Sequence, residues 1–373
     1  MFNTVNHIIR QKQFLLIFII ITIVLMLVAG FKPRGYRVFN RTELSTDGKG
    51  MRFHAPSIVY TREAWPLGRP QTTDTAFTVS MRLTPLHFCN YTIDRIISFC
   101  DTAYNENIII GQYDHCLVIQ AVTETTKRNF DCDSVFRPGK EVNISIISGI
   151  QEMKVYVDGK CKYGRQDNSI KAGDVIHPGR IVVGNSPQGN TAWEGIIRNI
   201  EIFGKELSED ELVGGQKWRS TQTLELAGDN HNRIAYYDFG KESRFRIAND
   251  FGKDKGLYVP RFFTMLKLNI LSLPDIGRIW SKDSILDYSV NFIGFIPFGF
   301  LLASLVYIKR PKRKTAIAVA TGFGGIFSLF IELVQVYIPT RSSEISDLFL
   351  NTLGSFFGAL MIVLVFRKRP GTL

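Results

Sequence analysis

The chain has 373 residues, enough for two or three domains, and its formal net charge is +11. Ten of its 45 Lys and Arg residues lie in three short flanks of apolar runs, which leaves 35 basic against 34 acidic residues elsewhere. This placement argues against nucleic acid as a partner. It is the positive-inside pattern of a membrane protein, in which basic residues collect beside the cytoplasmic ends of spans.

Four apolar windows approach the roughly 20 residues that a spanning helix needs: 14–30, 291–308, 315–338 and 348–366. Because the basic flanks precede the first window, join the second to the third and follow the fourth, both termini are predicted to be cytoplasmic. The protein is then integral to the cell (inner) membrane, with residues 31–286 and 339–346 outside. No clear small-x-small cleavage site follows Gly30, which favours an uncleaved first helix over a signal peptide.

The predicted fold class is a four-helix transmembrane bundle plus an all-β jelly-roll sandwich as an extracytoplasmic domain. The expected divisions are a cytoplasmic tail with the first span, a β-sandwich, an interfacial linker and a three-helix domain, at 1–31, 35–262, 263–286 and 287–369. The three helices are expected at about 289–308, 315–338 and 347–366. The linker fits either a segment lying on the outer leaflet or one packed on the β-sandwich.

The polar block contains short strand-like stretches punctuated by Gly, Asn, Asp and Pro, as in an all-β sandwich. Residues 154–160 predict a hairpin that turns at Asp158-Gly159, a dipeptide that tolerates positive φ. Residues 207–212 predict a short helix start with Ser208 as N-cap. One or two disulfides are expected in this oxidising location, with the pairing open, among Cys89, Cys100, Cys116, Cys132 and Cys161.

A succession of motifs within this block resembles a laminin-G or concanavalin A-like lectin jelly roll: residues 77–85, 155–159, 181–186 and 193–203 followed by 207–212. The resemblance implies two packed antiparallel sheets. Sugar binding in such domains lies in variable loops, so the fold alone does not establish it, and envelope glycan is the partner expected for the β domain. Candidate contacts are Asn185, Asn190 and Trp193, although Trp193 also fits the sandwich core. A structural calcium ion near Asp131 and Asp133 has weak support, and no other cofactor or metal is predicted.

The C-terminal apolar runs carry polar residues at helical spacing. The pattern Asp-x-x-x-Asn-x-x-Gly opens the second and fourth windows, and the third carries two polar residues near its end. With the inferred topology these side chains share one level at the outer leaflet, where unpaired ionisable groups are costly and indicate a functional site. The predicted membrane polar site consists of Asp287, Asn291, Glu332, Gln335, Arg341, Asp347 and Asn351.

Structural roles also fit these residues. Asp287 and Asp347 are candidate N-caps, and the amides are candidate hydrogen bonds between helices. A Glu332–Arg341 pair would serve either as a structural clasp or as an opening for a lipid head group. Close helix packing is expected at Gly294, Pro297, Gly299, Gly354 and Gly358.

The order of these motifs resembles the VanZ-like membrane family. The matching residues are Asp287, Asn291, Phe295, Pro297 and Gly299 in one block, and Glu332, Gln335, Arg341, Asp347, Asn351 and Gly354 in the next. The resemblance implies a link to low-level resistance to glycopeptide antibiotics such as teicoplanin, without a defined mechanism. The chain departs from the family in carrying a large β domain where a short loop is usual.

Three functions remain open from the sequence. The favoured one is a non-enzymatic envelope protein whose polar site engages an amphiphile, either a lipid-linked sugar phosphate or a lipophilic antibiotic, while the β domain binds glycan. The second is an intramembrane lipid-phosphate or glycolipid-processing enzyme that uses Asp287, Glu332 and Asp347. The third is a carbohydrate-active β domain held by an inert anchor.

Overall fold

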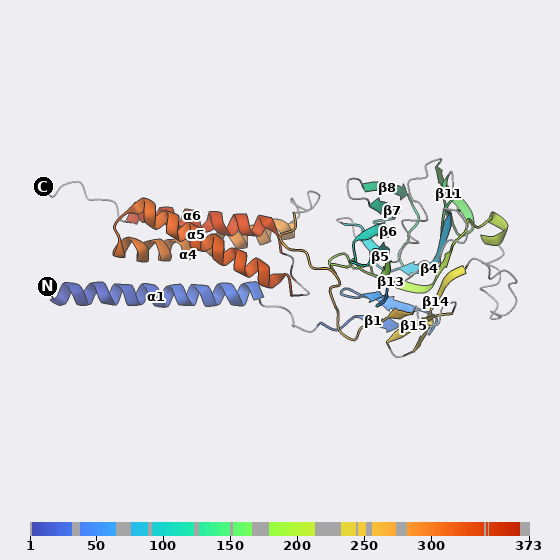
Figure 1. The fold of residues 1–373 in the computed structure, drawn as a ribbon, viewed down its shortest axis with the longest axis horizontal. Helices are drawn as coiled ribbons and strands as arrows, with labels where there is room; N and C mark the ends of the chain where they lie inside the picture. The colour runs from blue at the N-terminus through green and yellow to red at the C-terminus, as the bar shows by residue number, and fades with distance from the viewer. Residues whose placement is uncertain are drawn as a thin grey trace. The chain divides into compact units, whose positions relative to one another are not determined.

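The computed structural model describes residues 2–31, 38–64, 76–88, 92–122, 127–149, 152–165, 179–212, 233–243, 245–250, 256–273, 282–338, 341 and 343–365. The chain divides into two compact units (Figure 1). The helical domain comprises Met1–Tyr36 with Leu268–Leu373, and the β domain comprises Arg37–Lys267.

The β domain is an antiparallel sheet whose path bends back on itself into a nearly closed sandwich, as predicted. From one edge to the other, the order is β11-β10-β9-β4-β13-β14-β15-β16-β3-β12-β5-β6-β7-β8, and β1 and β2 lie off this path. The strands are β1 (Thr42–Leu44), β2 (Met51–Phe53), β3 (Val59–Tyr60), β4 (Phe77–Pro85), β5 (Asp94–Cys100), β6 (Glu106–Tyr113), β7 (Cys116–Val122), β8 (Lys127–Cys132), β9 (Val142–Ser148), β10 (Met153–Val157), β11 (Lys160–Arg165), β12 (Arg180–Val183), β13 (Gly195–Phe203), β14 (Arg233–Ser243), β15 (Arg246–Asn249) and β16 (Leu257–Tyr258). Figure 1 shows β5 to β8 next to one another, in the order of their pairing.

The core of the sandwich lies between the two halves of this path. Alternate residues of the strands point inward, and their aliphatic and aromatic side chains form one large cluster. Trp193 belongs to this cluster with only 1% of its surface exposed. Its indole Nε1 donates a hydrogen bond to Gln112 Oε1 at 2.7 Å, so its single polar group is satisfied inside the domain.

Two local predictions are confirmed. β10 and β11 form a hairpin in which Val157 pairs with Lys160, and Asp158 and Gly159 both adopt positive φ, of 49° and 80°. Ser208 caps the following helical turn reciprocally. Its Oγ accepts from Glu211 N at 3.3 Å, while Glu211 Oε2 accepts from Ser208 N at 2.8 Å.

The loop between β12 and β13 is held by Asn185, which is 0% exposed. Its Nδ2 donates to Ser57 O at 2.9 Å, and its Oδ1 accepts from the backbone N–H groups of Ser186 and Thr191 at 2.9 and 3.2 Å. One amide therefore satisfies two buried backbone N–H groups of this loop and the carbonyl of Ser57, which lies between β2 and β3.

The segment that leaves the β domain packs on its outer face. Phe263 is 5% exposed and joins a cluster with Ile58, Tyr60 and Val182, against which Met265 and Leu266 also pack. The first part of the expected linker therefore contacts the β domain. Residues 274–281 of the linker lie outside the described residues.

The helical domain contains α1 (Phe2–Phe31), α4 (Lys282–Lys309), α5 (Arg313–Gln335) and α6 (Ile345–Val365). All four are long and apolar enough to cross a membrane, and the protein is an integral membrane protein. α4 and α6 begin earlier than expected, which places Asp287 inside α4 and Asp347 in the first turn of α6. Neither aspartate is an N-cap residue, which corrects that interpretation. Asp347 still complements the positive end of its helix dipole.

Close packing joins α4 to α6 through glycines. A Cβ at Gly354, Gly358 or Gly299 would overlap the carbonyl oxygen of Phe292, Ile296 or Ser355, respectively. Backbones that approach this closely permit only Gly at the contact. Gly294 has no atom within 4 Å of such a Cβ, and Pro297 is exposed within α4, so these two candidates lie outside the contact.

Substitution of Gly358 by Ala should force α4 and α6 apart, because the new methyl group would overlap the Ile296 carbonyl oxygen. We expect a loss of stability of about 1–3 kcal/mol. The matched Gly294→Ala change should stabilise the helix by up to about 1 kcal/mol. The measurement is the thermal denaturation midpoint of the purified full-length protein in detergent, and equal midpoints for the two variants would contradict the contact.

Substitution of Asn185 by Ala should destabilise the β domain by about 2–4 kcal/mol, because it leaves three buried backbone groups without partners. Asn190→Ala, in the same loop but on an exposed residue, should cost less than about 1 kcal/mol. Denaturant unfolding of the full-length protein, followed through its β-sheet circular dichroism, compares the two. Equal shifts in the unfolding midpoint would refute the clamp role of Asn185.

Candidate functional site

Polar side chains gather at one end of the helical domain, where α4 and α6 begin and α1 and α5 end. We name this region the polar end. Its most buried ionisable group is Glu332, which is 1% exposed. Glu332 Oε2 accepts a hydrogen bond from Glu344 N at 3.0 Å, and the carboxylate is also hydrogen-bonded to the side chain of Ser343. The link between α5 and α6 thus folds back over this carboxylate and supplies its donors.

Two amides of the predicted site form hydrogen bonds between helices. Asn291 of α4 bonds to the carboxylate of Asp347 on α6. Asn351 of α6 donates from Nδ2 to Ser328 Oγ of α5 at 2.9 Å. These bonds tie the three C-terminal helices together just below the polar end.

Gln335 and Arg341 contact α1. Gln335 Nε2 donates to Gly30 O at 3.0 Å, and Arg341 Nη2 donates to Ala29 O at 2.9 Å. Both satisfy carbonyl groups that the last turn of α1 leaves free. The expected Glu332–Arg341 ion pair is not formed between these two described residues, because Arg341 is directed to α1 and Glu332 to the α5–α6 link.

The α5–α6 link is pinned by a segment that the sequence patterns did not single out. Ser272 N and Oγ both donate to Ser343 O at 2.8 Å, and Ile345 N donates to Ser272 O at 3.1 Å. Leu271 N adds a bond to Ser343 Oγ at 3.2 Å. Each of these contacts involves a backbone group and joins segments about 70 residues apart. No residue pattern in either segment predicts them.

The polar end carries an excess of negative charge among its described residues. Asp287 is exposed, Glu344 and Asp347 are half-buried, and Glu332 is sealed. Asp347 lies near Asp287 and Glu344, and Glu332 lies near Asp347 and Glu344, so the four carboxyl groups form one cluster. Arg341 is the basic side chain described at this end. Tyr288 lies beside the carboxylates and bonds to the side chain of Ser346.

Metal binding has no geometric support in the part of the chain that the structure describes. No group of three or more His, Cys, Asp or Glu side chains there is arranged to hold a metal ion. Asp131 and Asp133, the candidate calcium ligands, are both exposed, and Asp133 Oδ1 accepts a hydrogen bond from Cys116 Sγ at 3.1 Å. Desolvation, followed by this contact, raises the pKa of the Cys116 thiol to about 11.

The expected disulfides are absent among the described cysteines. Cys100, Cys116, Cys132 and Cys161 are all free thiols, and Cys89 lies outside the described residues. An internal disulfide of Cys89 would require one of the other four as its partner.

The predicted sugar contacts divide between the core and the surface. Asn185 and Trp193 are buried and bond within the domain, so neither side chain reaches a ligand, which corrects that interpretation. Asn190 is exposed, and its Oδ1 accepts from Ser186 Oγ at 2.8 Å.

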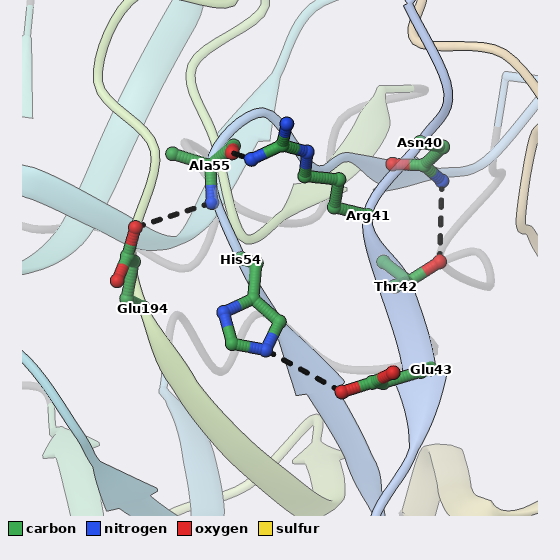
Figure 2. Close-up of a pocket in the computed structure, with 7 residues that line it drawn as sticks. All are labelled: Asn40, Arg41, Thr42, Glu43, His54, Ala55 and Glu194. Carbon is green, nitrogen blue, oxygen red and sulfur yellow. Dashed lines mark hydrogen bonds and ion pairs between the residues drawn. The ribbon is translucent and has the colours of Figure 1, made fainter.

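A cavity of about 460 Å³ opens elsewhere on the β domain (Figure 2). His54 Nε2 lies 3.4 Å from Glu43 Oε1, Arg41 Nη1 donates to Ala55 O at 3.1 Å, and Ala55 N donates to Glu194 Oε1 at 3.3 Å. The pairing of β2 with β1 and β13 brings these segments together, so their spacing in the sequence gave no sign of the cavity. Its lining is Asn40, Arg41, Thr42, Glu43, His54, Ala55 and Glu194.

Comparisons with known proteins divide the chain in the same way. Residues 248–366 match the VanZ/LLP1 family model, and residues 62–213 match the model of the concanavalin A-like lectin/glucanases superfamily. No protein with a curated description matches the sequence.

Solved structures resemble the chain only distantly. The CBM40 module of a Ruminococcus gnavus IT-sialidase bound to α2,3-sialyllactose is 13% identical over 38% of this chain and 83% of that chain, with a TM-score of 0.33. A heptameric SAP-like pentraxin from Limulus polyphemus is 14% identical over 60% of this chain and 100% of that chain, with a TM-score of 0.37. The tailspike protein 2 of Escherichia coli O157:H7 bacteriophage CAB120 is 11% identical over 55% of this chain and 30% of that chain, with a TM-score of 0.39. Similarity this low carries no argument about a ligand.

Both family resemblances inferred from the sequence are confirmed by the two family models. The C-terminal region of the chain, residues 248–366, thus matches the VanZ/LLP1 family, and residues 62–213, between the first and second apolar helices, match the concanavalin A-like lectin/glucanases superfamily.

Proposed function

We propose that this protein is a non-enzymatic binding protein of the cell envelope. In this proposal the polar end of the helical domain lies at the outer leaflet and holds the head group of an amphiphile, while the β domain binds envelope glycan. The observation that carries the first part is the excess of carboxylates over basic side chains among the described residues of the polar end. Carboxylates grouped at the edge of a bilayer are costly, and a cation relieves that cost.

The charge balance favours one of the two amphiphiles considered from the sequence. A sugar phosphate would meet Asp287, Glu344 and Asp347 together, whereas Arg341 is partly engaged by Ala29 O. An amphiphile with an ammonium group would instead be attracted by the same carboxylates. Tyr288 adds an aromatic ring beside them, and aromatic faces favour alkylammonium groups. A cationic head group is therefore the ligand that we assign to this site.

This assignment provides a physical basis for the resistance that the VanZ-like resemblance implies. A site that retains a cationic, lipophilic molecule at the membrane surface would keep it from its target deeper in the envelope. Such retention supports a role in glycopeptide resistance of the teicoplanin type or in the handling of envelope polysaccharide.

The β domain contributes a polar cavity suited to hydroxyl groups. Carboxylates, a guanidinium, an amide and an imidazole line it, so donors and acceptors alternate around the space. Fixed polar groups of this kind orient small ligands in protein sites. We assign neutral envelope glycan to this cavity.

An enzymatic role for Asp287, Glu332 and Asp347 is less well supported. General acid–base catalysis requires hydrogen-bond reach to the substrate. Glu332 is 1% exposed and already engaged by Glu344 N, so it does not face a bound head group.

The ammonium site is tested by the double substitution Asp287→Asn and Asp347→Asn. Asn at 347 keeps an acceptor for Asn291 while the charge is lost. We expect the affinity of the purified full-length protein in nanodiscs for a long-chain alkyltrimethylammonium probe to fall about tenfold. Arg341→Gln should leave that affinity unchanged. Tighter binding of the matching alkyl phosphate, lost in Arg341→Gln, would replace the ammonium assignment with the phosphate one.

The glycan cavity is tested by His54→Ala combined with Glu43→Gln, which removes two partly exposed lining groups without opening the core. Retention of full-length protein on immobilised neutral envelope polysaccharide should decrease about tenfold. The control is Glu63→Gln, which removes an exposed carboxylate outside the cavity. Equal retention of the two variants would contradict glycan binding at this place.

A further inference from the structure

A second cavity of the β domain, of about 340 Å³, is lined by basic residues and is not used by the function proposed above. Three segments surround it: the residues after β8, the turn that enters β9, and the β10–β11 hairpin. β8 and β11 are the two edges of the strand order, so the cavity lies at the strand edges of the nearly closed sandwich.

Four cations of this lining have no partner among the described residues. Arg137, Lys140, Lys160 and Lys162 are exposed, and none forms a side-chain hydrogen bond or ion pair with another described residue. We name them the basic cavity residues. Held together around one space, like charges repel one another unless an anion neutralises them.

The carboxylates of the lining, Glu141 and Asp158, offset only part of this charge. Both oxygens of Glu141 are occupied, because Oε1 accepts from Arg82 Nε at 2.6 Å and Oε2 accepts from Arg198 Nε at 3.0 Å. Asp158 Oδ1 accepts from Asn143 N at 3.0 Å. Glu141 is therefore neutralised by arginines outside the lining, and the cavity keeps a net positive charge.

The backbone determines the positions of these four basic residues. Lys160 and Lys162 of β11 both line the cavity, and Lys162 lies at a register shift where the strand has one residue more than β10. Arg137 and Lys140 belong to a turn closed by a bond from Lys140 N to Arg137 O at 3.1 Å, and Gly139 N anchors the turn to Pro85 O at 2.7 Å. The positive charges thus come from the turn before β9 and from β11, which both line one space.

Protection of a sheet edge explains only part of this arrangement. Lysines on an edge strand prevent pairing with another sheet, which accounts for Lys160 and Lys162 on β11. Arg137 and Lys140 lie outside any strand and have no edge to protect.

We propose that this cavity binds the anionic substituent, a phosphate or a carboxylate, of an envelope polysaccharide. The proposal deepens the function above and rests on its assignment of the β domain to glycan binding. Single-stranded nucleic acid is bound along an extended basic groove with stacking aromatic rings, and the described residues that line this cavity include no aromatic one, which favours a polysaccharide. The space suits one substituted sugar unit, since it lies at the small end of the range for ligand cavities.

The test compares two double variants of the full-length protein in nanodiscs of phosphatidylcholine, which carries no net charge. Lys160→Gln with Lys162→Gln should lower the affinity for dextran phosphate about tenfold. Lys49→Gln with Lys241→Gln removes the same charge from exposed positions outside the cavity and should change the affinity less than about twofold. Arg137→Gln with Lys140→Gln should repeat the first result, which guards against a folding defect in one variant.

Three results would overturn the proposal. Equal losses in the cavity and control variants would show that net charge alone attracts the polymer. Inorganic phosphate that displaces dextran phosphate at an equal phosphate concentration would show a site for a small ion only. A single-stranded oligonucleotide that binds more tightly than dextran phosphate, with the same loss in the cavity variants, would assign the cavity to nucleic acid.

The test of the basic cavity can fail independently of the test of the glycan cavity near His54. If neutral polysaccharide binds in a way that depends on His54 and dextran phosphate does not bind, only the proposal for the basic cavity is rejected. Binding of dextran phosphate that depends on Lys160 and Lys162, without neutral binding, supports the basic cavity and removes the other assignment.

Discussion

A carboxylate near the end of an apolar helix has to be satisfied from within the protein, and the helical domain is built around this requirement. Glu332 is sealed from solvent, and its donors come from the α5–α6 link, which must fold back over it. Residues 271 and 272 hold the link in that position. The last turn of α1 is tied to the same region by Gln335 and Arg341.

Close packing of α4 on α6 sets the level at which these groups meet. Because Gly354 and Gly358 face the backbone carbonyls of Phe292 and Ile296, the two helices have one favourable register. That register places Asn291 opposite Asp347 and leaves Asp287 exposed one turn away. The contact is a matter of packing, but it determines which polar groups are sealed and which remain open to a ligand. Asp287 and Asp347 are among the open ones, which is the ground on which we propose a cationic head group rather than a phosphate.

The β domain separates its structural polar groups from its exposed ones in a similar way. Asn185 and Trp193 use their polar atoms to hold a loop and to fix the core, so they belong to the fold. The exposed polar groups collect in two cavities of different charge, one mixed and one basic. A chain that binds both neutral and acidic parts of one glycan would use two such places.

Sequence patterns determined the architecture of this protein. Apolar length predicted four helices, the Asp158-Gly159 dipeptide predicted a hairpin, and Ser208 predicted a cap, because each of these features depends on neighbouring residues and backbone preference. The ordered motifs likewise identified both families. Helical spacing also indicated which polar residues of the spans share a stripe.

The partners of these residues were decided only by tertiary structure. Arg341 bonds to α1 rather than to Glu332, and a serine segment about 70 residues away closes the link, since both contacts depend on how separate segments approach. The helix starts were also misplaced, so Asp287 and Asp347 are not N-caps. The cavity near His54 likewise joins residues 40–55 to Glu194, which is distant in the chain. Residue periodicity predicts the face of a helix or strand on which a side chain lies. The group that this side chain contacts belongs to another element, and only tertiary packing brings the two together.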